Sequence, residues 1–395
     1  MIAIFAHADK MKLRLFSFFF SILFFHSTAS ALEYVQFTHQ GRERNEEGKI
    51  LAEDQRGLDF LARDGQAYHI RRANIIARRS DDTPFVPYTK TELLERLKQE
   101  FPPEEGYHFL DAFAYGSFIV VYTTSRDFAT WYGRLLQRLH ERYAAHWKRY
   151  GVELETPDFP MVAVVHANEE QFRQYARRNA VNIFQEQRAY YHKLTNRIVV
   201  YDMSELQVYQ AGDRRRTPSN LIRFLSHPDA PHNIRTLIHE AVHQVGFNTG
   251  MHSRFVLTPI WVIEGLALFH EVPDPRSRDV GWTFGPHVNH YRLERLRLYL
   301  SRPHHESPII KMIQDDKLFS QPATALDNYA LAWGLFYYLE RRRTSELATY
   351  LKMLQEKTDE MPDNAEKRRK DFEACFGNDW ERFDREFLDF IRRLR

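Results

Sequence analysis

Cysteine is almost absent from this chain of 395 residues, in which Cys375 is the only one. A single thiol cannot form a disulfide within one molecule, so the fold must be held by its core and not by covalent cross-links. We interpret Cys375 itself as a small buried apolar residue. The 30 Phe, 20 Tyr and 6 Trp residues supply much of the apolar surface that such a core needs.

An excess of positive charge is missing as well. The chain carries 55 Lys and Arg residues against 53 Asp and Glu residues. Residues 1–31 hold three of the bases and one of the acids, so the remainder has 52 of each and a net charge of zero. Because nucleic-acid-binding proteins need a basic surface, we expect no nucleic-acid partner. The short basic clusters at 214–216, 341–343 and 367–370 lie near acids and are typical of solvated faces.

The apolar stretch near the N-terminus is too short to span a membrane. Residues 15–25 form an apolar run of 11 residues, whereas a spanning helix needs about 20. The basic residues at 11–14 precede this run and the small residues STASA at 27–31 follow it, which is typical of a secretory signal peptide. We predict that residues 1–31 are removed and that the mature protein is periplasmic or extracellular, without a membrane span. An uncleaved membrane anchor is the alternative.

The N-terminal part of the mature chain has the pattern of a small β-rich module. Apolar and polar residues alternate within residues 48–79, and Arg56-Gly57 and Asp64-Gly65 divide them as turns. A short helix is expected at residues 90–100. We assign residues 32–104 to this module and residues 105–395 to a second domain.

The second domain mixes strands with helices and then becomes almost entirely helical from Pro231 onward. This order predicts an α+β fold. The expected elements are strands at 118–122, 161–165 and 196–203, and helices at 126–149, 169–177 and 379–395.

Residues 236–247, TLIHEAVHQVGF, place polar side chains in the middle of a helix that is otherwise apolar. We expect Asn233 to cap this helix. His239 and His243 are four residues apart and share one face, with Glu240 beside them. Burying two imidazoles and a carboxylate is costly without a partner, and a zinc ion is the partner that this spacing favours. Because the pattern also arises by chance, its context must decide.

The context is a second apolar helix, residues 258–271, with the sequence TPIWVIEGLALFHE. Glu264 is the one acid within its apolar part, and a buried carboxylate needs a partner. We expect Gly265 and Ala267 to let the first helix approach closely.

Together the two helices offer three metal ligands, which are His239, His243 and Glu264. Three protein ligands leave a fourth position open for water, which is typical of a catalytic zinc site and not of a structural one. We therefore predict one Zn²⁺ ion per chain, with Glu240 as the general base.

The segments HEAVH and WVIEGLA resemble the gluzincin pattern, in which His-Glu-x-x-His is followed by a Glu in a Glu-Gly-x-Ala context. Within gluzincins the chain resembles the peptidase MA-like secreted bacterial proteins, and most closely the family named domain of unknown function 1570. The resemblance covers roughly residues 107–395. It implies a zincin-like fold, with a small sheet and helices, an active-site helix and a helical C-terminal half.

Two further expectations follow from the resemblance. Some gluzincins place an Asp four residues after the ligand Glu, where it orients a ligand His. Here that position is Leu268, so the partner of His239 or His243 must come from elsewhere in the chain. Zincins often bind substrate along an edge strand, and strand 196–203 is the candidate for this role.

An oxyanion stabiliser is also needed, and Tyr329 is our candidate because Tyr or His from the helical half fills this role in related enzymes. The alternative is that Tyr329 is a core residue. We expect His270 to face away from the metal and the pair His304-His305 to lie in a loop. Weaker candidates for the oxyanion stabiliser are His252, Arg254, His287, His290 and Tyr291.

These features favour a secreted zinc-dependent metallopeptidase that hydrolyses peptide bonds of a peptide or protein substrate. One alternative is a non-catalytic zinc-fold protein that binds a protein or cell-wall partner. Another is a zinc amidase that acts on a non-peptide substrate. Substitution of Glu240 separates the first alternative from an enzyme, and substrate profiling separates the second.

Overall fold

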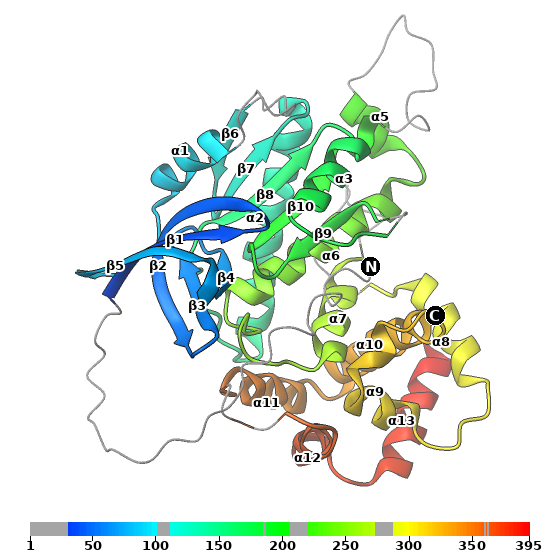
Figure 1. The fold of residues 1–395 in the computed structure, drawn as a ribbon. Helices are drawn as coiled ribbons and strands as arrows, with labels where there is room; N and C mark the ends of the chain where they lie inside the picture. The colour runs from blue at the N-terminus through cyan, green and yellow to red at the C-terminus, as the bar shows by residue number, and fades with distance from the viewer. Residues whose placement is uncertain are drawn as a thin grey trace, which may run out of the picture.

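The computed structural model describes most of the chain and has the predicted α+β fold, with two sheets followed by a helical C-terminal half (Figure 1). The described residues are 31–100, 111–184, 187–205, 220–272, 287–358, 361 and 363–395. Three sequence-based expectations lie outside them: all but the last residue of the signal peptide, the boundary at 104/105 and the basic cluster at 214–216.

The first sheet is antiparallel and carries a small core of its own. Its strand order is β4-β3-β2-β1-β5, and seven residues such as Phe37 and Phe60 form its buried cluster. Helix α1 follows the sheet and buries Leu93 and Leu97 in the main core. The elements are β1 (Ala31–His39), β2 (Arg42–Glu53), β3 (Gly57–Ala62), β4 (Ala67–Arg71), β5 (Ile75–Pro84) and α1 (Lys90–Glu100).

The second sheet has three parallel inner strands and an antiparallel strand at each end, in the order β6-β7-β8-β10-β9. The expectation that strand 196–203 is an edge strand is wrong, because β10 lies between β8 and β9. The chain folds back into β10 after β9, so β9 takes the edge. The strands are β6 (Asp111–Tyr115), β7 (Phe118–Tyr122), β8 (Met161–His166), β9 (Ala189–His192) and β10 (Arg197–Tyr201).

Helices cover both faces of the second sheet. Successive side chains on a strand point to opposite faces. On β9, Tyr191 stacks on Phe247 of α6, whereas Tyr190 packs against Phe172 of α3. The long helix α2 packs beside α6, so α2 and α6 share one face and α3 covers the other. The helices are α2 (Arg126–Arg149), α3 (Glu169–Arg178) and α6 (Ala230–Asn248).

The C-terminal half is helical, and its helices from α7 to α13 lie below the second sheet in Figure 1. Helices α7 and α10 pack closely, since a Cβ atom added to Gly265 would lie 2.8 Å from the Ala332 carbonyl oxygen. Gly265 thus serves contact with α10 and not, as expected, with α6. The remaining helices are α5 (Asn220–Ser226), α7 (Ile260–His270), α8 (His290–Leu300), α9 (Pro308–Gln314), α10 (Ala325–Arg342), α11 (Thr344–Gln355), α12 (Ala365–Phe376) and α13 (Trp380–Arg393).

Two local expectations need correction. Helix α6 begins at Ala230, so Asn233 lies inside the helix and not at its cap. Pro231 is pre-organised for the first helical turn, which explains the earlier start. Cys375 is half-buried and packs against the main core, so it is less enclosed than expected. Among the described residues, no helix combines the length and apolar character needed to cross a membrane.

The first sheet docks onto the turn between β9 and β10. The amide of Ala67 in β4 donates to the Leu194 carbonyl oxygen at 2.8 Å. Beside this bond the buried Arg197 guanidinium pairs with Glu100 at 2.6 Å and lies 3.8 Å from Asp64. The β9–β10 hairpin is therefore held by residues from both the first sheet and α1.

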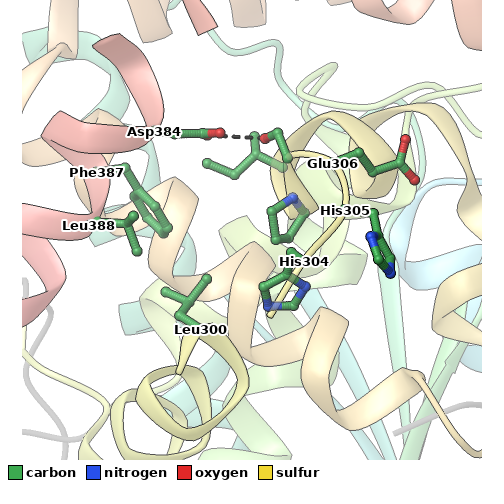
Figure 2. Close-up of a pocket in the computed structure, with 10 residues that line it drawn as sticks. Leu300, His304, His305, Glu306, Asp384, Phe387 and Leu388 are labelled. Carbon is green, nitrogen blue, oxygen red and sulfur yellow. Dashed lines mark hydrogen bonds between the residues drawn. The ribbon is translucent and has the colours of Figure 1, made fainter. Parts of the chain in front are cut away.

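A surface hollow of about 350 Å³ lies between the loop before α9 and helix α13 (Figure 2). Leu300, Ile309 and Phe387 supply apolar lining, and the Ser307 hydroxyl donates to Asp384 at 3.0 Å. The pair His304-His305 lies in this loop, as expected from the sequence.

Candidate metal centre

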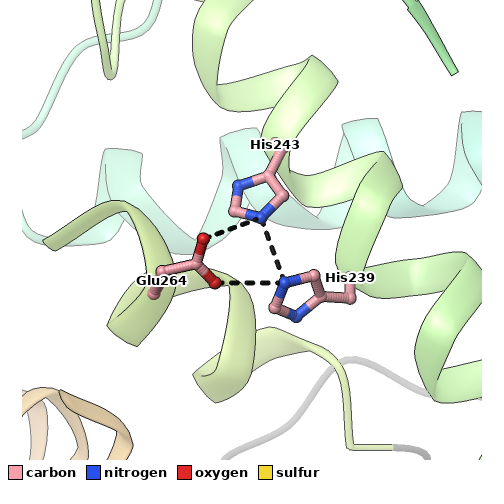
Figure 3. Close-up of side chains that lie close together, drawn as sticks. All are labelled: His239, His243 and Glu264. Atoms are coloured by element: carbon pink, nitrogen blue, oxygen red, sulfur yellow. Dashed lines mark hydrogen bonds and ion pairs between the residues drawn. The ribbon is translucent and has the colours of Figure 1, made fainter. Parts of the chain in front are cut away.

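Three side chains from two helices converge on one point (Figure 3). Helix α6 supplies His239 and His243, and α7 supplies Glu264. The two Nε2 atoms are 3.0 Å apart, and the Glu264 carboxylate oxygens lie 3.3 Å from His239 Nε2 and 3.7 Å from His243 Nε2. All three residues are at most 2% exposed. The structure thus brings together the three ligands that the sequence predicts.

The geometry of this group fits a zinc ion. The donor atoms all lie within 4.8 Å of one another. Ligand atoms bound to a tetrahedral zinc ion at about 2.0–2.1 Å lie about 3.3 Å apart, which the three measured separations bracket. Glu264 Oε2 and His243 Nδ1 are buried and form no hydrogen bond among the described residues, although Glu264 Oε2 lies 3.3 Å from His239 Nε2. A buried carboxylate oxygen without such a partner is expected where a cation is to be held.

A fourth residue, Glu271, orients His239. Its Oε2 atom lies 2.8 Å from His239 Nδ1, and its Oε1 atom accepts from Asn289 Nδ2 at 3.0 Å. Burial would raise the pKa of Glu271, but the hydrogen bond from His239 and the charges of His239, Arg292 and Arg235 lower it. The ionised carboxylate therefore favours a proton on Nδ1, which leaves Nε2 to bind a metal.

Sequence reasoning missed this role of Glu271, although a signal was present. Glu271 follows Glu264 by seven residues, which is two helical turns, so both carboxylates lie on one side of α7. Leu268 occupies the position where some gluzincins carry an orienting Asp. One further turn along the same helix provides the carboxylate instead.

The electrostatics of the centre favour a positive charge. Burial on its own would lower the pKa of His239, but Glu264 and Glu271 outweigh it and raise this pKa to about 10. Burial and the neighbouring His239 hold the pKa of His243 well below its usual value. Glu264 and Glu271 thus favour a positive charge on His239, whereas His243 stays neutral. The same two carboxylates would also stabilise a bound metal cation.

Glu240 lies between the centre and the edge strand. It is buried, and its Oε2 atom accepts a hydrogen bond from the Tyr191 amide of β9 at 2.8 Å. Burial is the largest influence on its carboxyl group and raises the pKa to about 7, against the opposing effects of His239 and of the Tyr191 amide. A group with such a pKa can exchange a proton near neutral pH.

Tyr329 of α10 is buried and lies close to the same centre. Its ring packs edge-on against Phe319 at 5.4 Å, and the Arg292 guanidinium is 5.7 Å from the ring centroid. Burial, and then the charge of Glu264, raise the pKa of Tyr329 well above its usual value, so the phenol keeps its proton. Tyr329 is thus a core residue that also lies near Glu264, and its predicted role as an oxyanion stabiliser stays a prediction.

Two of the weaker candidates lie behind the C-terminal end of α6. His252 is buried and packs against Phe247 at a centroid distance of 5.4 Å. Arg254 donates to the carbonyl oxygens of Lys193 and Leu194 at 2.9 and 3.0 Å. Arg254 therefore supports the β9–β10 turn, His252 packs on the end of α6, and neither belongs to the ligand group.

The other weaker candidates are also outside the ligand group. His290 and Tyr291 are exposed in the first turn of α8, and His287 is half-buried just before it. His270 packs edge-on against Tyr143 at 5.2 Å and so points toward α2, away from the metal ligands as expected.

One comparison with known protein families matches the part of the chain that contains this centre. Residues 233–360 match the model of the family described as Protein of unknown function (DUF1570). The matched segment contains His239, His243, Glu264, Glu271 and Tyr329. This match supports the family resemblance found in the sequence, and its description names no activity. No curated protein matches the chain.

Proposed function

We propose that this protein is a secreted zinc-dependent metallopeptidase. The observation that carries the proposal is the buried convergence of His239, His243 and Glu264, with the Glu240 carboxylate beside it. Two imidazoles and one carboxylate are the ligands of several catalytic zinc sites.

His239, His243 and Glu264 would hold the zinc ion. When bound, the ion supplies Lewis-acid chemistry, which polarises a carbonyl group and lowers the pKa of water. Glu271 holds the ring of His239 through Nδ1, so that Nε2 faces the site and would bind the ion on losing its proton.

Glu240 moves the proton. As a carboxylate it takes a proton from the attacking water, whose oxygen forms a bond to the carbonyl carbon of the substrate. It then delivers that proton to the nitrogen as the carbon–nitrogen bond breaks. The raised pKa of Glu240 suits both steps, because the group gains and loses a proton near neutral pH. Tyr329, which keeps its phenolic proton, is the candidate donor to the carbonyl oxygen.

A peptide substrate is favoured over other amides by the edge strand. Because β9 lies at the end of the sheet, an extended peptide can pair with its outer backbone groups. The Tyr191 amide of β9 donates to Glu240, so a peptide bound along β9 would lie next to the proton-transfer group.

The test combines metal analysis with cleavage. The purified mature protein is expected to hold about one zinc ion per chain by elemental mass spectrometry and to cleave members of an unbiased peptide library. Glu240→Gln should keep its zinc but lose about 10²–10⁴-fold in kcat/KM. Glu170→Gln, which changes an exposed carboxylate on α3, is the matched control and should match the parent.

Three results would contradict the proposal. A purified protein that contains no zinc and does not bind added zinc would show that the metal centre does not exist. Cleavage by Glu240→Gln at the parental rate would remove Glu240 as the base. Bound zinc without cleavage of any peptide would favour a non-catalytic zinc-binding protein or an amidase with a non-peptide substrate.

A further inference from the structure

Three arginines form an arc beside the candidate metal centre, which we call the arginine rim. Arg188 immediately precedes the edge strand β9, Arg235 lies one turn before His239 on α6, and Arg292 lies in the first turns of α8. Arg188 and Arg235 are half-buried, and Arg292 is buried. The rim thus runs from the edge strand, across the first half of α6, to the helical half of the molecule.

The rim is tied to the centre by direct contacts. Arg235 Nη1 donates to Asn289 Oδ1 at 3.4 Å, and Asn289 Nδ2 donates to Glu271 at 3.0 Å. Glu271 in turn contacts the ligand His239 at 2.8 Å. At the other end, Arg292 lies 5.7 Å from the ring centroid of Tyr329. A group bound at the rim would therefore lie on the His239 side of the centre.

Among the described residues, the side chains that contact Arg188 and Arg235 are neutral. Arg188 Nη1 donates to Asn233 Oδ1, and Arg235 Nη2 lies 3.0 Å from His232 Nδ1. Within the described part of the chain, neither Arg188 nor Arg235 forms an ion pair with a carboxylate. The nearby Glu271 carboxylate is already engaged by His239 and Asn289.

The chemistry of guanidinium groups indicates what such a rim binds. Each guanidinium has five N–H donors, and the contacts above use one donor of Arg188 and at most two of Arg235. The remaining donors suit the two oxygens of a carboxylate, which can accept two parallel hydrogen bonds. Partial burial strengthens such a pairing because fewer water molecules screen it.

We propose that the arginine rim binds a carboxylate of the substrate, so that the protein prefers acidic peptides. This inference rests on the proposed function in that the bound molecule is a peptide. The carboxylate can come from an acidic side chain or from a free C-terminus, and the experiment distinguishes the two sources.

The experiment measures binding without turnover. The zinc-supplemented Glu240→Gln variant is titrated calorimetrically with three otherwise identical N-acetylated hexapeptides. One has a central Glu-Glu pair and a C-terminal amide, one has Gln-Gln and the amide, and one has Gln-Gln and a free C-terminus. We expect at least one carboxylate-bearing peptide to bind about tenfold or more tightly than the neutral peptide.

The rim variants identify the residues responsible. Introducing Arg188→Gln and Arg235→Gln together into the Glu240→Gln variant should abolish the preference for the carboxylate-bearing peptide. The Kd of the neutral peptide should stay within about twofold of its value in Glu240→Gln alone. Arg177→Gln, which alters an exposed arginine on α3, should leave the preference unchanged. Circular dichroism and zinc content verify that each variant is folded. Preference for the Glu-Glu peptide assigns the rim to side chains, and preference for the free acid assigns it to C-termini.

Equal binding of the three peptides, or a preference that survives in the rim variant, would overturn the inference. Cleavage by the parent protein is measured in parallel. Preferential binding of a carboxylate-bearing peptide without cleavage of any peptide would support the arginine rim and contradict the peptidase proposal. Cleavage without such a preference would support the peptidase proposal and contradict the arginine rim.

Discussion

The histidine pair on α6 and the histidine pair before α9 occupy opposite environments. His239 and His243 are buried, face each other across 3.0 Å and share the carboxylate of Glu264. His304 and His305 are exposed, and His304 Nε2 contacts the Tyr299 carbonyl oxygen at 3.0 Å. In the described residues only the α6 pair belongs to a group of metal-type ligands.

The difference teaches what turns histidines into a ligand pair. A spacing of four residues on a helix stacks two side chains on one face, whereas adjacent residues in a loop diverge. Burial then removes water as a competitor, and Glu264 and Glu271 supply the negative charge that a cation needs. The loop pair lacks both the spacing and the burial, although Glu306 stands next to it in the sequence.

The strongest test of this comparison removes each histidine in turn. His239→Ala and His243→Ala should lower zinc from about one ion per chain to nearly none, because each removes one of three protein ligands. His304→Ala and His305→Ala should keep the full zinc content. Elemental mass spectrometry after dialysis measures this. If the His304 and His305 variants lost zinc while the His239 and His243 variants kept it, the loop pair and not the α6 pair would hold the metal.

A second test uses a tyrosine from each environment. Tyr329→Phe should lower kcat by about 10²–10³-fold if its hydroxyl donates to the carbonyl oxygen of the substrate, with zinc content unchanged. Tyr299→Phe, beside His304, should leave kcat as in the parent. Steady-state kinetics on one cleaved peptide gives both values. A parental kcat for Tyr329→Phe would assign this residue to the core alone.

A third test uses an acid from each environment. Glu271→Gln should weaken zinc binding about 10–100-fold, because a neutral amide holds the His239 ring less firmly in its ligand orientation. Glu306→Gln, next to the loop pair, should have no effect. Competition with a chelator measures the affinity without reference to catalysis. Equal zinc affinity in the parent and in Glu271→Gln would show that Glu271 does not support the metal ligand.

The smallest expected effect is on the pH profile. Glu240 accepts a proton only as a carboxylate, so kcat/KM should rise as the pH increases and level off above the pKa of this group. That pKa is about 7 without a metal, and a neighbouring cation lowers it, so the rising limb is expected at or below pH 7. A value of kcat/KM that falls over the same range would contradict the role of Glu240 as base.

Much of the fold could be predicted from local sequence patterns. Helices α1 and α2 begin and end where their amphipathic pattern and caps predict, with Ser125 capping α2 through the Phe128 amide. Strand β9 was missed, because its four residues AYYH are too few to show alternation. The start of α6 was misplaced because Asn233 resembles a cap in sequence, whereas Pro231 marks the first turn.

The candidate site divides in the same way. His239, His243 and Glu264 could be predicted because helical spacing and an apolar surround are visible in the sequence. The contact of Asn289 with Glu271 and the position of Arg188 beside Asn233 could not be, since they depend on how α8 and β9 pack against α6. Candidate metal ligands can thus be identified from local sequence patterns, whereas the residues that support them can be identified only from the tertiary structure.

The hydrogen bond from Ala67 to Leu194 has a consequence for how this protein should be divided into fragments. It joins the first sheet to the turn between β9 and β10, and Asp64 and Glu100 secure the same turn through Arg197. A truncated protein that starts after α1 would lose all of these supports at once. The N-terminal sheet therefore supports the β9–β10 hairpin, and a shortened protein intended for activity measurements should retain it.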